Sequence, residues 1–313
     1  MISIVWLTLS LGHRSPKSIE DDLRQRLVHV QYGSPAFRRA IRTVSRRARY
    51  GVGWQSVLGP SPMRIGVFDL NGLTESIGFW PTKTGTGVDK LDELQQLSDS
   101  GDSPHPIADG ESYRKGDRLV RCGSEMSLGN WMLPVARVYH LVDSHWSLYK
   151  SQSVDGWELA TETPTRFIRR GGKVDPKSID VVYGVNPPHL GQPFSGPLLL
   201  CSELWRVHGD QILKSPQHRL PTVLLELDRL AGLAQAGKRS EFDSAVPPSS
   251  RSELWKLLQF AISVSYVGND DESGSDTLCS PKDADRSDRG AGPKWFMHFR
   301  KRDGHWRLVR ISH

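Results

Sequence analysis

Histidine and aspartate side chains gather at His140, Asp143 and His145. Imidazole and carboxylate groups are metal ligands, so this spacing could begin a metal site. On a strand, Asp143 and His145 share one face and His140 points to the other. No third ligand can be identified for that face. We therefore interpret the three residues as a polar turn between two strands, and we expect neither a metal nor a cofactor.

Three short segments match only parts of catalytic signatures. Residues 101–103, Gly-Asp-Ser, lie in a Pro-rich stretch with no strand before them. Ser147 and Lys150 have the spacing of a Ser-x-x-Lys motif, but their segment alternates like a strand and does not begin a helix. The Gly-rich run at 84–87 lacks the Lys of a phosphate-binding loop, and the three cysteines form no Cys-x-x-Cys pair. We assign no catalytic residue and lean away from an enzyme.

The segment 37–49 has an amphipathic pattern with an almost purely basic polar face. At about 100° per residue, the apolar residues fall on one side of a helix and the arginines on the other. The basic face consists of Arg38, Arg39, Arg42, Arg46 and Arg49. Like charges three or four positions apart destabilise a helix by a few tenths of a kcal/mol per pair. Solvent and salt, the acids at 20–22, the acid-rich stretch 89–117 or an external anion must offset them.

The excess positive charge of the chain lies in its N-terminal region. Residues 1–60 hold ten Lys or Arg against three acids, a net +7, whereas the whole chain has a formal net charge of +6. A basic helix face is the electrostatic footprint of a polyanion binder, for nucleic acid or for an anionic membrane. A solvated or ion-paired face has the same composition. We favour the solvated face and keep polyanion binding as the alternative.

Cap signals predict two helices within residues 18–50. Ser18 with Asp21 is typical of a helix start. Ser34 followed by Pro35 is another, because proline at the first helical position gives up no hydrogen bond. These two helices must position the arginines.

Turn signals predict the hairpins that follow. The dipeptide at 71–72, Asn-Gly, favours a two-residue turn and predicts a hairpin over 63–80. The segment 81–116 predicts a loop with a short helix over 88–97, because few of its residues are apolar. Alternating runs predict strands over 133–170.

The second half of the chain begins with a segment, 171–197, that is rich in Pro and Gly and predicts a linker-like stretch. Apolar residues at helical spacing predict a helix over 222–236, which Gly237 ends. The polar stretch 268–293 has no periodicity and predicts a disordered insertion between two strands.

The last hairpin leaves two turn registers open. A two-residue turn would place Arg300 opposite Arg307, and facing like charges destabilise a strand pair. A three-residue turn, 302–304, would place Arg300 opposite Trp306. We favour the three-residue turn.

The predicted fold class is α+β, with mostly antiparallel hairpins and a few helices. We expect a basic N-terminal region over 1–170, a linker over 171–197 and a C-terminal region over 198–313. The order of two helices and a meander ending in Asp-Gly-His-Trp-Arg-Leu-Val-Arg-Ile resembles the C-terminal part of NTF2-like domains. This resemblance covers residues 222–312 and implies a fold, without catalytic residues to carry over.

The sequence leaves function open among three classes. We favour a non-enzymatic binding or accessory protein that works through a pocket or sheet face. The alternatives are a nucleic-acid-binding protein that uses the basic helix face, and an enzyme whose site is assembled from distant residues. The apolar stretch 2–9 is too short to span a bilayer and lacks the flanks of an export signal. It predicts a first strand, and it leaves a soluble protein with the cytoplasm favoured over export.

Overall fold

The computed structural model describes residues 19–46, 52–70, 73–95, 107–126, 132–154, 165–191, 198–270, 275–281 and 294–312. The strand expected at 2–9, the cap at Ser18, Arg49 and the turn at 71–72 lie outside these residues. In the part of the chain that is described, no helix is long and apolar enough to cross a membrane.

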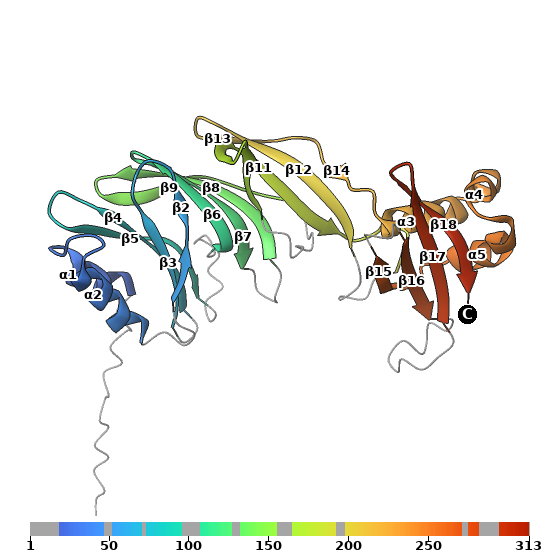
Figure 1. Cartoon of the computed structure of the whole chain (residues 1–313), viewed down its shortest axis with the longest axis horizontal. Helices are drawn as coiled ribbons and strands as arrows, with labels where there is room; N and C mark the ends of the chain where they lie inside the picture. Colours follow the sequence, from blue (N-terminus) through green and yellow to red (C-terminus); the bar gives the residue numbers. More distant parts are fainter. Residues whose placement is uncertain are drawn as a thin grey trace, which may run out of the picture. The chain divides into compact units, whose positions relative to one another are not determined.

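Helices and mostly antiparallel sheets make up the chain, which confirms the α+β class (Figure 1). The described helices are α1 (Ile19–Leu27), α2 (Pro35–Ser45), α3 (Val223–Gln235), α4 (Arg239–Ala245), the 3-10 helix η1 (Pro248–Ser250) and α5 (Arg251–Leu258). The described strands are β1 (Val52–Gln55), β2 (Val57–Leu58), β3 (Arg64–Leu70), β4 (Leu73–Pro81), β5 (Thr86–Gln95), β6 (Ile107–Lys115), β7 (Arg118–Met126), β8 (Met132–Val142), β9 (His145–Ser153), β10 (Arg166–Arg170), β11 (Lys173–Val185), β12 (Leu199–His208), β13 (Gln211–Lys214), β14 (His218–Arg219), β15 (Ser265–Asp270), β16 (Ser275–Pro281), β17 (Lys294–Arg302) and β18 (His305–Ser312).

The strands form four sheets, and the chain divides into two compact units. The strand orders are β1-β3-β4-β5, β2-β6-β7-β8-β9, β10-β11-β12-β13 with β14 beside β12, and β15-β16-β17-β18. One unit comprises residues 1–121 and 138–149, and the other comprises residues 122–137 and 150–313.

In the first unit, α1 and α2 cover one face of the β1-β3-β4-β5 sheet. As predicted, Pro35 begins α2, and the Ser34 hydroxyl accepts the backbone N–H of Phe37 at 3.1 Å. The buried face of α2 joins the core of this unit through Phe37, Ile41 and Val44. The apolar half of the amphipathic pattern therefore packs against the sheet.

A buried carboxylate anchors α1 on this sheet. Glu75 of β4 is fully buried, and its Oε2 accepts the backbone N–H of Ile19 at 3.1 Å. Its Oε1 lies 4.0 Å from Nζ of Lys90. A carboxylate at the first turn of a helix also interacts favourably with the helix dipole, so this contact fixes where α1 begins on the sheet.

A second buried charge network crosses the interior of the first unit. The Arg121 guanidinium of β7 forms an ion pair with Asp92 of β5 and donates to Oε1 of Gln55 at 2.8 Å. The hydroxyl of Tyr139 donates to Asp92 at 2.5 Å. Arg121 and Asp92 are both buried, so the ion pair helps to compensate each charge away from water.

The helix expected over 88–97 is wrong, because residues 86–95 form the strand β5. Val88 and Leu91 are three positions apart, as on one face of a helix. On a strand an odd separation places them on opposite faces. Val88 packs against α1 and α2, whereas Leu91 packs with Trp80 and Trp146 in a separate cluster. Charged residues between and after the two apolar positions, Asp89, Lys90, Asp92 and Glu93, make the strand resemble a polar helix in the sequence.

The hairpin expected over 63–80 is present in the described residues as β3 with β4. The strands expected over 133–170 include β8 and β9, which are neighbours in one sheet, whereas β10 lies in another sheet and pairs with β11. The segment 171–197, expected to be linker-like, instead contains the strand β11. Gly171 and Gly172 turn the chain with φ of +56° and +77°, a conformation that glycine adopts without a steric penalty. β11 then pairs with β12 over residues 178–185.

The C-terminal helices pack on the β15-β16-β17-β18 sheet around one apolar core. The insertion expected to be disordered over 268–293 contains the end of β15 and all of β16. Residues 271–274 and 282–293 lie outside the described part. β16 shows no strand periodicity in the sequence, because Leu278 is its one large apolar residue. Backbone pairing with β15 and β17 holds it in the sheet.

The three-residue turn expected in the last hairpin is also wrong. Arg300 faces Arg307, and Lys301 faces Trp306, so the turn has two residues. Asp303 and Gly304 have φ of +51° and +78°, the positive values that this turn type requires. Both arginines are exposed, so water screens their repulsion and turn geometry sets the register. These helices and strands do not by themselves confirm an NTF2-like fold.

The buried pair of Arg121 and Asp92 gives a stability prediction. Arg121→Met should lower the free energy of unfolding by about 3–5 kcal/mol, because it breaks a buried ion pair while Asp92 stays buried. The double variant Arg121→Met/Asp92→Leu should recover part of that loss. Urea unfolding measures all three chains.

The matched control is Arg166→Met, which removes an exposed arginine and should change stability by less than about 0.5 kcal/mol. A double variant that is less stable than Arg121→Met would contradict the charge argument.

Candidate functional site: a cavity beside α3

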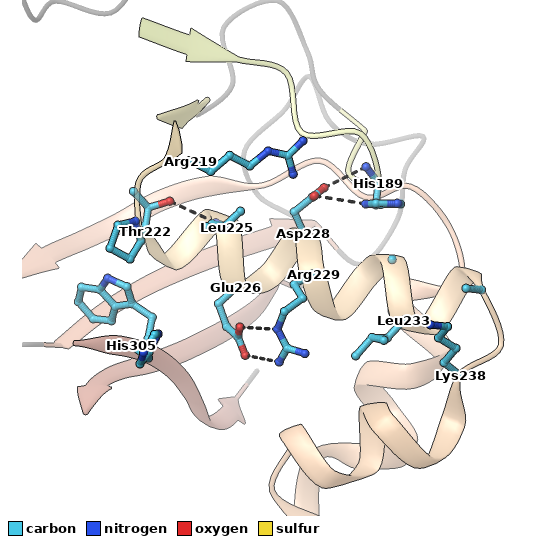
Figure 2. A pocket seen from close by; sticks show the side chains of 14 residues that line it. His189, Arg219, Thr222, Leu225, Glu226, Asp228, Arg229, Leu233, Lys238 and His305 are labelled. Carbon is cyan, nitrogen blue, oxygen red and sulfur yellow. Dashed lines mark hydrogen bonds and ion pairs between the residues drawn. The ribbon is translucent and has the colours of Figure 1, made fainter. Parts of the chain in front are cut away.

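A cavity of about 590 Å³ lies in the second unit, along the exposed side of α3 (Figure 2). Its walls come from the end of the loop after β11, from β14, from α3 and from the start of β18. The lining residues are His189, Arg219, Pro221, Thr222, Leu225, Glu226, Asp228, Arg229, Gly232, Leu233, Ala236, Lys238, His305 and Trp306. Segments far apart in the sequence therefore meet at one helix.

The helix α3 is defined at both ends by its own sequence. The Thr222 hydroxyl accepts the backbone N–H of Leu225 at 3.2 Å, which caps the first turn. Gly237 has φ +70°, and the N–H of Lys238 donates to the carbonyl of Leu233 at 2.9 Å. This left-handed cap ends the helix as predicted. The two caps therefore define where α3 begins and ends beside the cavity.

Asp228 is a buried carboxylate on the core-facing stripe of α3, with 2% of its surface exposed. Its Oδ1 accepts the backbone N–H of His189 at 2.9 Å, and its Oδ2 lies 3.2 Å from Nδ1 of the same residue. Figure 2 shows both contacts on one side of the helix. Two contacts to one residue tie the loop that carries His189 to the middle of α3.

Gly232 makes room for the imidazole. A Cβ atom at this position would lie 3.0 Å from Cε1 and 3.2 Å from Nδ1 of His189. Glycine inside a helix costs about 0.5–1 kcal/mol relative to alanine, so the close approach of the ring explains why the helix carries it. The Gln235 amide also donates to the His189 carbonyl at 2.8 Å.

Most charges at the cavity are paired with one another. Glu226 accepts two hydrogen bonds from Arg229, at 2.7 and 2.8 Å. Lys238 lies 3.6 Å from Glu241. The exception among the lining cations is Arg219, which is exposed and forms no ion pair with any described residue. In Figure 2 its guanidinium is turned toward the side where Asp228 and His189 meet.

An apolar wall completes the cavity. Its residues are Leu225 and Leu233 of α3, Pro221 and Ala236 at the two ends of that helix, and Trp306 of β18. The Trp306 ring is buried, and Nζ of Lys301 lies 5.8 Å from its centroid. The site can therefore accept a molecule that has both an anionic group and an apolar body.

The described lining offers a base but no activated nucleophile. A His–Asp pair orients an imidazole so that its second nitrogen can accept a proton. The lining contains no serine or cysteine, and the hydroxyl of Thr222 already accepts the helix-cap hydrogen bond. The one lysine of the lining, Lys238, is ion-paired with Glu241.

The arginines predicted from the sequence lie in the other unit, and none lines this cavity. Arg38, Arg39, Arg42 and Arg46 are exposed on α2 and form no ion pair with any described residue, while Arg49 lies outside the described part. Two acids of α1 pair within their own helix, Glu20 with Arg24 and Asp22 with Arg26.

The two histidines of β8 and β9 contact different partners. His145 is paired with Asp89, with 3.0 Å between Nδ1 and Oδ1. The rings of His140 and Tyr149 meet edge to face at 5.4 Å. Asp143 has φ +49° in the two-residue turn between the strands. Among the described residues, no group of three or more His, Cys, Asp or Glu could hold a metal ion.

Sequence reasoning missed the residues of the cavity. The one available signal was Asp228, a charged residue within the apolar stripe of a predicted helix. His189 and Arg219 carry no local signal, because only the fold brings their segments to α3.

No protein-family model matches the chain, and no curated protein matches it. Among solved structures, a similar chain is a protein from Lactobacillus plantarum, with 9% sequence identity and a TM-score of 0.22. The likeness covers 83% of this chain and 71% of that one. A TM-score this low supports no statement about fold or function, so any function must rest on the geometry of the site.

Proposed function

We propose that the protein is a binding protein that takes a small organic anion into the cavity beside α3. The observation that carries the proposal is the unpaired guanidinium of Arg219 at the rim. The cavity's other charged groups support a cationic site, because three lining cations, Arg219, Arg229 and Lys238, face two carboxylates, Glu226 and Asp228, an excess of one positive charge.

The internal pairing leaves Arg219 for a ligand. Glu226 is engaged by Arg229, and Asp228 by His189. A carboxylate or phosphate on a ligand would form charge-assisted, bidentate hydrogen bonds with a free guanidinium, and these are among the stronger polar contacts in proteins. The anionic group is therefore expected at Arg219.

The rest of the ligand is expected to be apolar. Leu225, Leu233 and Trp306 add apolar surface to the lining. Cavities of about 300–1,000 Å³ with apolar walls and a few polar groups are typical of small-molecule sites. This pattern supports binding of an amphipathic molecule such as an aromatic or aliphatic acid.

A general-base enzyme is the second candidate. It is favoured by one observation, the His189 imidazole oriented by a buried aspartate. Its nucleophile would have to be water, since the described lining supplies none. We also propose that residues 222–312 have an NTF2-like fold, on the strength of their order of helices and strands.

Phenyl phosphate and benzoate test the binding site, with benzyl alcohol as the neutral probe. Both anions should bind the wild type by calorimetric titration. Arg219→Gln should weaken them by about 10- to 100-fold, the loss of a hydrogen-bonded charge. The matched control is Arg206→Gln, an exposed arginine of the same unit that does not line the cavity. Equal affinity in the two variants, or equal binding of benzyl alcohol, would rule the proposal out.

Two carboxylates of α3 should differ in their effect on stability. Asp228→Asn should lower the free energy of unfolding by about 1–3 kcal/mol, because it removes a buried charge that accepts two contacts. Glu226→Gln should cost less than about 1 kcal/mol, because its partner Arg229 is half-exposed. Urea unfolding at neutral pH compares them, and a larger loss for Glu226→Gln would mean that His189 is not held as described.

A further inference from the structure

The exposed side of α2 presents cations that the chain itself does not neutralise. Four arginines, Arg38, Arg39, Arg42 and Arg46, form this basic face, and none has an ion pair among the described residues. Like charges at these spacings destabilise the helix. An external anion would remove that repulsion.

The internal acids that could offset this charge have other partners. Glu20 and Asp22 pair with the arginines of α1. In the acid-rich stretch that follows β4, Asp89 contacts Arg24 and His145, and Asp92 pairs with Arg121. Folding therefore uses these carboxylates elsewhere and leaves the basic face without them.

An anionic membrane is a poor fit for this face. Phe37, Ile41 and Val44 are buried against the sheet, so α2 has no apolar side that could enter a bilayer. Helices that lie in a membrane interface bury their apolar face among the lipids. The exposed side of α2 is therefore suited to a polyanion that the arginines contact at the protein surface, without insertion of the helix.

An exposed aromatic ring lies on the sheet face that α1 and α2 cover. Trp54 is on the edge strand β1, and its register partners are Gly66 of β3 and, one strand further, Ile77 of β4. Ile77 belongs to the core beneath α1 and α2, so Trp54 lies on the same, helix-covered face of the sheet. Its ring centroid is 6.1 Å from that of Phe79, and 47% of the residue remains exposed.

A further arginine extends the positive surface along this sheet face. Arg64 of β3 pairs with Phe79 in register and is exposed. Burial raises the pKa of the Tyr32 hydroxyl, and the positive charges of Arg64 and Arg114 partly oppose that rise. Arg64 thus adds positive charge on β3, the strand that pairs with β1 and Trp54.

We infer that α2 and Trp54 form a binding surface for single-stranded nucleic acid, with the arginines on the phosphates and the indole stacked on a base. Proteins that bind single strands combine a basic track with exposed aromatic rings in this way. A duplex keeps its base faces stacked inside, so it could use the arginines but not Trp54. This surface is independent of the cavity beside α3.

Fluorescence anisotropy with labelled oligo(dT), at about 50 and 200 mM salt, tests the inference. Changing Arg38, Arg42 and Arg46 together to Gln should weaken binding by more than about tenfold and make the salt slope shallower by about 2. Trp54→Ala should weaken binding by about 5- to 150-fold, and Trp54→Phe should retain most of it because a ring remains.

The matched control changes Arg166, Lys173 and Arg206 to Gln, which removes the same number of exposed cations from the other unit. Thermal unfolding establishes that each variant is folded. Three results would overturn the inference: equal affinity for a duplex of the same sequence, an equal loss in the control, or binding to phosphatidylserine vesicles without binding to oligo(dT). Binding that depends on the arginines but not on Trp54 would also contradict it.

Discussion

The contacts between His189 and Asp228 determine what the C-terminal cavity can bind. They take up the one deeply buried carboxylate of its lining and hold the loop after β11 against α3. If Asp228 were free, it would be the natural partner for a cation and would compete with any anionic ligand. Asp228 is instead engaged by His189. Among the described residues, Arg219 is the one charged lining residue without an ion pair, so we expect the cavity to favour an anion.

The same principle acts in the first unit. Buried acids accept contacts that hold the fold together: Glu75 at the start of α1, Asp89 beneath Arg24, and Asp92 with Arg121. The arginines of α2 receive none of these contacts. In both units these buried carboxylates hold internal structure together, while exposed guanidiniums remain at the surface. We therefore expect both candidate sites to select for negative charge.

Local chemistry made part of this predictable from the sequence. The Ser34-Pro35 start of α2, the Thr222–Gly237 limits of α3 and the exposed arginine face depend on neighbouring residues alone. The errors arose where backbone pairing outweighs side-chain pattern. β5 and β16 carry too few apolar residues to show a strand period, and the Asp303-Gly304 turn fixes a register that places two arginines opposite each other. The cavity could not be predicted, because His189, Arg219 and Trp306 meet only through tertiary structure.

The most direct test of anion binding at Arg219 is to follow its side-chain Nε–H resonance by NMR as phenyl phosphate is added. We expect the Nε–H resonance of Arg219 to shift saturably with added phenyl phosphate. The resonance of Arg229 should shift much less, because Glu226 already holds that side chain. Binding of phenyl phosphate without a shift at Arg219, or with the larger shift at Arg229, would contradict the claim that the unpaired guanidinium defines the site.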